Sequence, residues 1–191
     1  MKQDDHGKVK EIFPTLETER LLCRQLSTDD AAILHSYWSD EEVTKYFSLD
    51  PFKNIAETID MIVLLSKLLD ANLGVRWAIT RKQDHTVLGT CGFHNYKPEH
   101  SRVEMGYELG KEFWGQGIMA EALTAILAYG FTQRGYNRVE AFVNFGNAKS
   151  IRILKNMGFK QDGLLRDYEF NRGAFVSQYC YSLLKRDYLN R

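Results

Sequence analysis

The stretch from residue 101 to residue 144 constrains the fold of this chain more than any other. SRVEMGYELG is typical of a β-strand, GIMAEALTAILAYGFTQRG (117–135) has the apolar spacing of a helix and ends at a glycine, and NRVEAFVN (137–144) is typical of a second strand. A strand, a helix and a strand in this order predict a right-handed crossover that joins two parallel strands. The chain is therefore expected to form a mixed sheet.

Further strands and helices are predicted on both sides of this unit. LETERLLCRQL (16–26) is typical of a strand, and VRWAITR and TVLGTCGFHNY, separated by turn residues, predict an antiparallel meander. Two last strands, at about 159–170 and 174–184, turn around NRG. Helices are predicted in STDDAAILHSYW, over 54–70, and in NAKSIRILKNMGF, where Asn147 is the expected N-cap.

Length and composition favour one soluble globular domain. The 191 residues are 44% hydrophobic and 26% charged, which excludes a disordered chain and a fibrous repeat. Residues 1–15 are predicted to be a polar lead-in, and residues 16–188 to be the domain. Lys plus Arg equals Asp plus Glu at 25 each, so no net charge draws the molecule to nucleic acid or to an anionic membrane. An anionic ligand has to be bound by local groups.

The cysteines and the apolar segments indicate a cytoplasmic protein without a metal site. Cys23, Cys91 and Cys180 are odd in number and lack the close spacing of a zinc site or a redox pair. The N-terminal residues lack the apolar core of a signal peptide. The most apolar window, MIVLLSKLLDANL, is too short to span a bilayer and is interrupted by Lys67 and Asp70.

Two glycines precede the crossover helix in EFWGQGIMAEAL. The first turn of a helix exposes unpaired N–H groups at the positive end of the helix dipole, and these bind phosphate where the backbone can come close. Gly115 and Gly117 permit that approach, and Gln116 between them offers a side-chain donor. The alternative is that the glycine pair only makes the turn into the helix.

Two familiar phosphate motifs do not fit this loop. Gly115, Gly117 and Ala120 spell the dinucleotide fingerprint G-x-G-x-x-A, but KEFW separates them from the preceding strand, and Glu140 lies too early in the next strand to bind a ribose. A Walker-type loop is excluded because no Gly-Lys pair is followed by Ser or Thr.

The ordered set of motifs resembles the GNAT superfamily of acyl-CoA N-acetyltransferases, and within it the branch of bacterial ribosomal-protein N-terminal acetyltransferases. The stretches that carry the resemblance are ETERLLCRQLSTDDA, VLGTCGFHN, VEMGYELGKEFWGQGIMAEAL, NAKSIRILKNMGF and NRGAFVSQYCYSLLKRDY. The resemblance implies a single α/β (α+β) domain with a mixed, mostly antiparallel sheet of seven strands, about four helices, and an acyl-CoA cleft between splayed central strands.

The resemblance also implies a cofactor loop. The family pattern [Q/R]-x-x-G-x-[G/A] falls on residues 114–119, where Gly117 matches and Trp114 and Met119 depart in the WGxG form of the ribosomal-protein branch. Acetyl-CoA is the implied cosubstrate, with no metal, and Trp114 is expected to be an anchor in the core. The residues expected to hold the pyrophosphate through the backbone are Gly115, Gln116, Gly117, Ile118, Met119 and Ala120.

Catalytic roles follow from the same resemblance. Glu104, in VEMGYEL, is the implied base, with its pKa expected to be raised by apolar neighbours; the alternative is a solvated residue on a half-exposed strand. Glu108, on the same strand face, is the second choice. The N–H of Met105, or of a close neighbour, is the candidate donor to the thioester carbonyl.

Asn147 and Ser150 match the family's NxxS segment. Asn147 is implied to contact the pantetheine arm, and Ser150 to protonate the thiolate, although an N-cap and a first-turn residue are their structural alternatives. Many relatives use a tyrosine where this chain has Leu154, so the general acid is Ser150 or a water. Asn144 is a further candidate contact to CoA. His94 is placed on the acceptor side, with a structural role at the end of a strand as the alternative. Tyr107 and Tyr46 are assigned to an acceptor pocket or to the core.

The predicted reaction is transfer of an acetyl group to a primary amine by direct attack in a ternary complex, since no cysteine is placed to carry the acetyl group. The expected acceptor is a protein α-amino group, such as a ribosomal-protein N-terminus. Alternatives are a small amine, such as a polyamine or an aminoglycoside, and a CoA-binding or interaction module without catalysis. By resemblance the protein is expected to form a homodimer.

Overall fold

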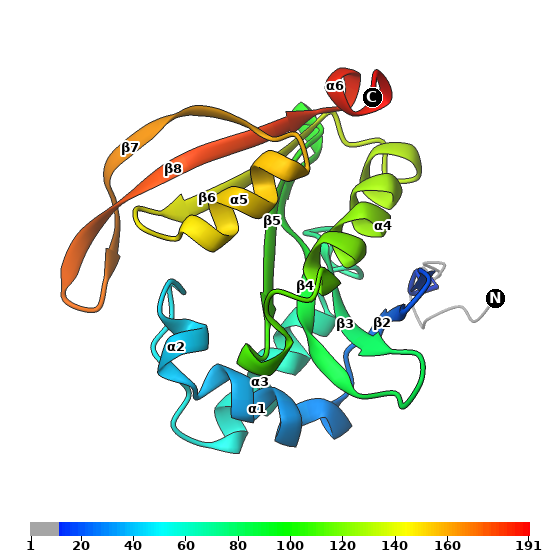
Figure 1. Cartoon of the computed structure of the whole chain (residues 1–191), viewed down its shortest axis with the longest axis vertical. Coiled ribbons are helices and arrows are strands. Elements are labelled where there is room, and N and C mark those ends of the chain that lie inside the picture. Colours follow the sequence, from blue (N-terminus) through cyan, green and yellow to red (C-terminus); the bar gives the residue numbers. More distant parts are fainter. Residues whose placement is uncertain (1–11) are drawn as a thin grey trace.

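Eight strands form one mixed sheet in the computed structural model of the chain, which describes residues 12–191 (Figure 1). The strand order is β1-β2-β3-β4-β5-β6-β8-β7, and only the β5–β6 pair is parallel. The strands are β1 (Leu16–Glu17), β2 (Leu21–Gln25), β3 (Val75–Arg81), β4 (Val87–Lys97), β5 (Arg102–Leu109), β6 (Arg138–Asn144), β7 (Lys160–Asn171) and β8 (Ala174–Leu184). The predicted fold class and the parallel crossover are confirmed.

The element counts differ from the prediction of seven strands and about four helices. The strand predicted at 16–26 is two strands, because the chain turns at Thr18, whose N–H donates to Leu21 O at 3.0 Å. The helices in residues 12–191 are α1 (Ala31–Trp38), α2 (Glu41–Thr44), α3 (Ile55–Ser66), α4 (Ile118–Thr132), α5 (Ala148–Asn156) and α6 (Lys185–Leu189). Helices α2 and α6 have only four and five residues, too few for an apolar period to show.

The helices cover both faces of the sheet. Helix α4 and Leu154 of α5 pack on one face, around a core in which the Trp77 ring lies 5.4 Å from Tyr129. Helices α1 and α3 pack on the other face through Leu34, Trp38 and other apolar side chains. None of the helices in residues 12–191 is long and apolar enough to cross a bilayer.

Strands β5 and β6 pair over only three residues and then part. The pairs are Arg102 with Arg138, Val103 with Val139, and Glu104 with Glu140. Beyond them β6 remains paired with β8 along its whole length, so β6, β8 and β7 turn away together from β5 (Figure 1). The predicted splay of the two central strands is therefore confirmed.

A buried carboxylate joins the strands where they are still paired. Glu140 is only 5% exposed and accepts from Arg138 Nε at 2.7 Å, with Arg102 Nη1 at 3.5 Å. Arg138 also binds Asp162 of β7 at 2.6 Å. Because these charges neutralise one another inside the fold, they fix the closed end of the opening and leave the other end free to separate.

Candidate active site

The backbone at the start of α4 is open to a ligand. Gly115 and Gly117 have φ values of 75° and 74°, a region that favours glycine. Gly117 is the N-cap of α4, and no side chain caps the helix there. A Cβ on Gly115 would meet nothing within 4 Å, and one on Gly117 would meet only Arg20 Nη2, at 3.6 Å. The first-turn N–H groups of α4 thus have space before them at the positive end of the helix dipole.

Most side chains of the loop are buried or hydrogen-bonded within the protein and are not available to a ligand. The predicted side-chain donor to an anion, Gln116, instead donates from Nε2 to Glu112 O at 2.7 Å, so it holds the turn and leaves only its backbone for a ligand. Ile118 and Met119 are buried. Trp114 is partly buried against both cores and donates from Nε1 to Leu109 O at 3.0 Å, which confirms its expected role as an anchor.

Two cations lie beside the loop. Arg20 Nη1 donates to Gln116 O at 3.2 Å, and Glu121 holds the same guanidinium through Nε at 2.6 Å. Lys149, on α5, places its Nζ 3.8 Å from the centre of the Trp114 ring. The charge of Arg20 is balanced by Glu121, so the local positive charge here comes from Lys149 and from the helix N-terminus itself.

Glu104 stands at the last residue pair before β5 and β6 part, and its side chain is 28% exposed. It accepts from Asn95 Nδ2 at 3.1 Å, and His94 Nε2 lies 3.5 Å away. Burial raises the pKa of Glu104, but hydrogen bonds from His94 and Asn95 and the charge of Arg102 outweigh it, and the pKa falls below its ordinary value. The expected raised pKa is wrong: Glu104 is a carboxylate at neutral pH.

A β-bulge brings these side chains together. Two residues of β4, Asn95 and Tyr96, lie opposite Val103 alone between the pairs that flank them. Asn95 has a φ of 53°, in the left-handed region that asparagine tolerates best after glycine. Strand alternation does not predict such an extra residue, and for this reason the sequence gives no sign of the Asn95 contact.

The second candidate base, Glu108, is buried and held by three donors. It pairs with Arg76, accepts from Thr90 Oγ1, and accepts from Trp38 Nε1 at 3.1 Å. Its carboxylate therefore joins β3, β4, β5 and α1, and Glu104 is the more accessible acid of this strand face.

Three more predicted residues lie near the opening between β5 and β6. Met105 follows directly after the last β5–β6 pair, and its side chain is buried, so its predicted role falls to its N–H. Asn144 ends β6, where Nδ2 donates to Tyr46 O at 3.2 Å and Oδ1 accepts from Gln178 at 2.8 Å. Asn147 caps α5, accepting the N–H of Ser150 at 3.1 Å as predicted.

Tyr107, which sequence reasoning places only among pocket or core aromatics, contacts one of the candidate site residues. Its hydroxyl lies 2.7 Å from Ser150 Oγ, across the gap between β5 and α5. Burial raises the pKa of Tyr107 to about 12, while the hydrogen bond with Ser150 opposes this shift. Tyr107 thus remains protonated at neutral pH and forms a proton-bearing pair with Ser150.

Comparison with known proteins decides the family. Residues 20–160 match the model of the acetyltransferase (GNAT) domain. This chain belongs to the GNAT family. It is 43% identical to the uncharacterized N-acetyltransferase p20 of Bacillus licheniformis over 174 residues, which cover 91% of this chain and 98% of p20. The chain is accordingly an N-acetyltransferase, of a family that uses acetyl-CoA.

Solved structures repeat the fold with different acceptors. RimL, a ribosomal L7/L12 α-N-protein acetyltransferase, superposes with a TM-score of 0.81 at 18% identity, covering 93% of this chain and 97% of RimL. The spermidine N-acetyltransferase of Vibrio cholerae, in complex with CoA and spermine, superposes with a TM-score of 0.79 at 21% identity, covering 91% of this chain and all of that one. The fold alone does not select the acceptor.

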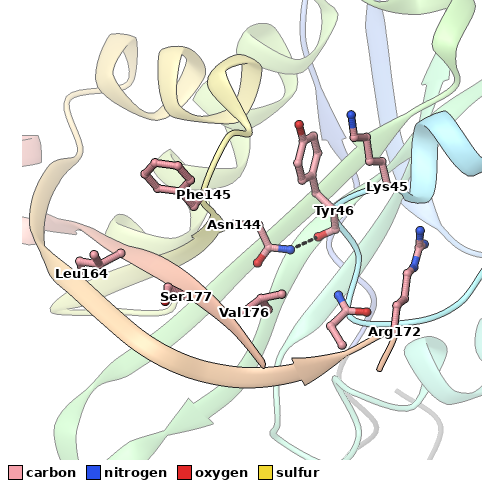
Figure 2. A pocket seen from close by; sticks show the side chains of 9 residues that line it. Lys45, Tyr46, Asn144, Phe145, Leu164, Arg172, Val176 and Ser177 are labelled. Carbon is pink, nitrogen blue, oxygen red and sulfur yellow. Dashed lines mark hydrogen bonds between the residues drawn. The ribbon is translucent and has the colours of Figure 1, made fainter. Parts of the chain in front are cut away.

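This acetyltransferase has a pocket of about 540 Å³ at the carboxyl end of β6 (Figure 2). The segment after α2 closes one side of the pocket. The carbonyl of Tyr46 accepts a hydrogen bond from the Asn144 amide, and the Tyr46 hydroxyl donates to Gly146 O at 3.1 Å. The pocket is lined by Lys45, Tyr46, Asn144, Phe145, Leu164, Asn171, Arg172, Val176 and Ser177. Of these, only Tyr46 and Asn144 are site candidates from the sequence alone.

Proposed function

We propose that this enzyme transfers the acetyl group of acetyl-CoA to the α-amino group of a protein or peptide, by direct attack in a ternary complex. The observation that carries this proposal is the parting of β5 from β6 directly beyond Glu104, with the uncapped glycine loop of α4 following the end of β5. An extended pantetheine arm fits between two strands whose facing edges have no partner strand. The anionic end of the cofactor then falls on the glycine loop.

The residues present fit acetyl-CoA. The N–H groups of residues 115–120 would bind the pyrophosphate, and Lys149 would supply positive charge beside it, while Arg20 stays paired with Glu121. Asn147, at the start of α5, would contact the pantetheine arm. Asn144, predicted to do the same, has both amide atoms bonded to Tyr46 and Gln178, so it would act by holding the end of β6 in place. When bound, the cofactor supplies a thioester carbonyl that an amine attacks. The N–H of Met105 would polarise that carbonyl, because it lies just beyond the last strand pair.

The site offers a base for the amine and a proton donor for the departing thiolate. Glu104, ionised at neutral pH, would accept the proton of the attacking ammonium directly or through a water, with His94 beside it. Ser150 would give a proton to the departing thiolate and recover it from the hydroxyl of Tyr107. Two protons leave the ammonium nitrogen as the amide forms. Glu104 takes the first and passes it to solvent, and the second replaces, through solvent, the proton that Tyr107 and Ser150 give to the thiolate. The net products are the amide, the thiol and one proton.

A protein α-amine is favoured over a small amine by the pocket at the end of β6. It lies beyond the reacting centre along the same strand, so it has room for the residues that follow an N-terminus. RimL, which shares the fold, acts on such an amine.

The test is the release of CoA thiol and the mass shift of the acceptor, with N-terminally free peptides and acetyl-CoA. Wild type is compared with Glu104→Gln and with Glu99→Gln, an exposed glutamate of the β4–β5 turn. We expect Glu104→Gln to lower kcat/KM by roughly 100-fold, the size of a general-base contribution, and Glu99→Gln to match wild type. Failure of wild type to acetylate any free N-terminus would overturn the proposed acceptor.

A further inference from the structure

The charge of the pocket at the end of β6 identifies the class of acceptor more closely. We propose that this pocket binds acidic side chains at about the third and fourth residues of a peptide acceptor, and that the enzyme discriminates against polyamines. The inference rests on the proposed function, since it concerns the acceptor of the same site.

The described residues that line the pocket bring positive charge and no negative charge. Two of the nine are cations, Lys45 and Arg172, and none is Asp or Glu. Lys45 comes from the segment after α2 and Arg172 from the β7–β8 turn, and Arg172 donates to Thr44 O, so both cations stand on the side of the pocket nearest α2 (Figure 2). An acceptor that brings cations here meets like charge, whereas one that brings carboxylates is attracted.

The charge of Lys45 is not compensated. Lys45 is exposed, its Nζ lies 5.4 Å from the centre of the Tyr46 ring, and it forms no ion pair with any carboxylate in residues 12–191. Arg172 is partly compensated, because its Nε lies 3.7 Å from Asp50. A further acid nearby, Glu169, accepts from Gln178 at 2.8 Å and does not line the pocket. The residues that line the pocket therefore carry a net positive charge.

The walls of the pocket are held in place before any acceptor arrives. Asn171, which is 9% exposed, donates to Phe47 O at 2.7 Å, and Arg172 Nη2 donates to Thr44 O at 2.9 Å. Together with the bond from Asn144 to Tyr46 O, these contacts tie the segment 44–47 to the β6–β8 half of the sheet. A preformed pocket loses little conformational entropy when it binds a side chain.

The position of the pocket sets the register of the acceptor. Glu104 pairs with Glu140, and Asn144 at the pocket lies four residues further along β6, which is about 13 Å at roughly 3.3 Å per residue. With the pantetheine arm in the gap between the strand edges, an extended peptide that lies across the face of the sheet covers this distance with its first three or four residues. A peptide whose amine reaches Glu104 thus presents its third and fourth side chains to Lys45 and Arg172, while a polyamine presents ammonium groups there.

The test measures kcat/KM for two peptides that differ only at residues 3 and 4, both Glu in one and both Lys in the other, with spermidine and free glutamate as further acceptors. We expect the acidic peptide to exceed the lysine peptide and spermidine at least tenfold, with a smaller ratio at high salt. Lys45→Glu should reduce this ratio about tenfold or more. The matched control, Lys67→Glu, changes an exposed lysine at the end of α3 outside the pocket and should leave the ratio unchanged.

The outcomes separate this inference from the proposed function. Acetylation of the lysine peptide or spermidine as fast as the acidic peptide, or an unchanged ratio in Lys45→Glu, would overturn the acidic preference while the proposed function stands. Free glutamate reacting as well as the acidic peptide would overturn the peptide register. If no peptide is acetylated although spermidine is, the proposed protein acceptor fails together with this inference.

Discussion

Gly117 is the residue on which cofactor binding depends most directly. It starts α4 at a φ of 74°, and Gly135, beyond the other end of α4, has a φ of 70°, with no atom within 4 Å of the place that a Cβ would take. Alanine at either position carries the same backbone strain, about 1 kcal/mol. Only at position 117 would a methyl group stand before the first-turn N–H groups that the pyrophosphate is proposed to approach.

We therefore expect Gly117→Ala to weaken acetyl-CoA binding by about tenfold, the loss of one hydrogen bond to a charged group. Gly135→Ala should lower the melting temperature by about as much as Gly117→Ala does and leave the affinity for acetyl-CoA unchanged. Calorimetric titration of both variants with acetyl-CoA measures the difference. Equal affinities in the two variants would contradict the placement of the pyrophosphate.

Tyr107 and Ser150 are proposed to deliver one proton together. We expect Tyr107→Phe and Ser150→Ala each to lower kcat by roughly tenfold or more, and the double variant to lose no more than the worse single variant, because either change interrupts the same route. With the Tyr107 pKa raised to about 12, its deprotonation should produce no fall in kcat below about pH 11. Multiplicative losses in the double variant would show two independent roles.

At the scale of the elements, Glu121 fastens the first turn of α4 to the turn between β1 and β2. Its carboxylate accepts from Thr18 Oγ1 at 2.5 Å, from Arg20 N at 2.8 Å and from Arg20 Nε at 2.6 Å. Burial raises the pKa of Glu121, but the hydrogen bonds from Thr18 and Arg20 outweigh burial and bring the pKa below its ordinary value. The folded state thus favours the ionised carboxylate.

A carboxyl whose pKa is lowered by folding stabilises the protein above its unfolded pKa and loses that contribution as the pH falls through the folded pKa. We expect Glu121→Gln to cost about 1 kcal/mol of unfolding free energy at pH 7, and the difference from wild type to shrink as the pH falls below about 4. Urea unfolding at several pH values measures it, with exposed Glu41→Gln as control. A difference that does not change with pH would refute the ionic origin.

The elements that could be predicted from the sequence are those whose signal is local and long. Helix α4 and the strands on either side of it follow from periodicity and from flanking glycines. The division of β1 from β2 was missed because TERL contains no glycine, proline or asparagine to mark a turn.

The contacts of the candidate site likewise divide into those that the sequence predicts and those that it does not. The glycine loop is visible because its residues are adjacent in the sequence. The pairing of Arg76 with Glu108, 32 residues apart, and that of Tyr107 with Ser150, 43 residues apart, depend on strand register and on the placement of α5. The sequence alone predicts neither the strand register nor the placement of α5. The lowered pKa of Glu104 likewise depends on a bulge that places Asn95 beside it.

For the whole molecule, the decisive feature is that one sheet separates into two halves. Strands β1 to β5 form one half and β6, β8 and β7 the other, joined by three β5–β6 pairs and by the charges around Glu140. The segment 44–47 crosses to the second half through the bonds to Asn144 and Asn171. The proposed cofactor would fill the separation, so its binding should be seen first in the backbone of the parted strands.

Residue-resolved amide hydrogen exchange, with and without saturating acetyl-CoA, shows whether the cofactor fills this separation. We expect added protection within residues 105–109, where β5 has no partner on the β6 side, and within 115–120, where the loop enters α4. The β7–β8 turn at residues 171–174 should exchange as before. Unchanged exchange in both 105–109 and 115–120, with saturation shown by a raised melting temperature, would contradict the proposed cofactor site.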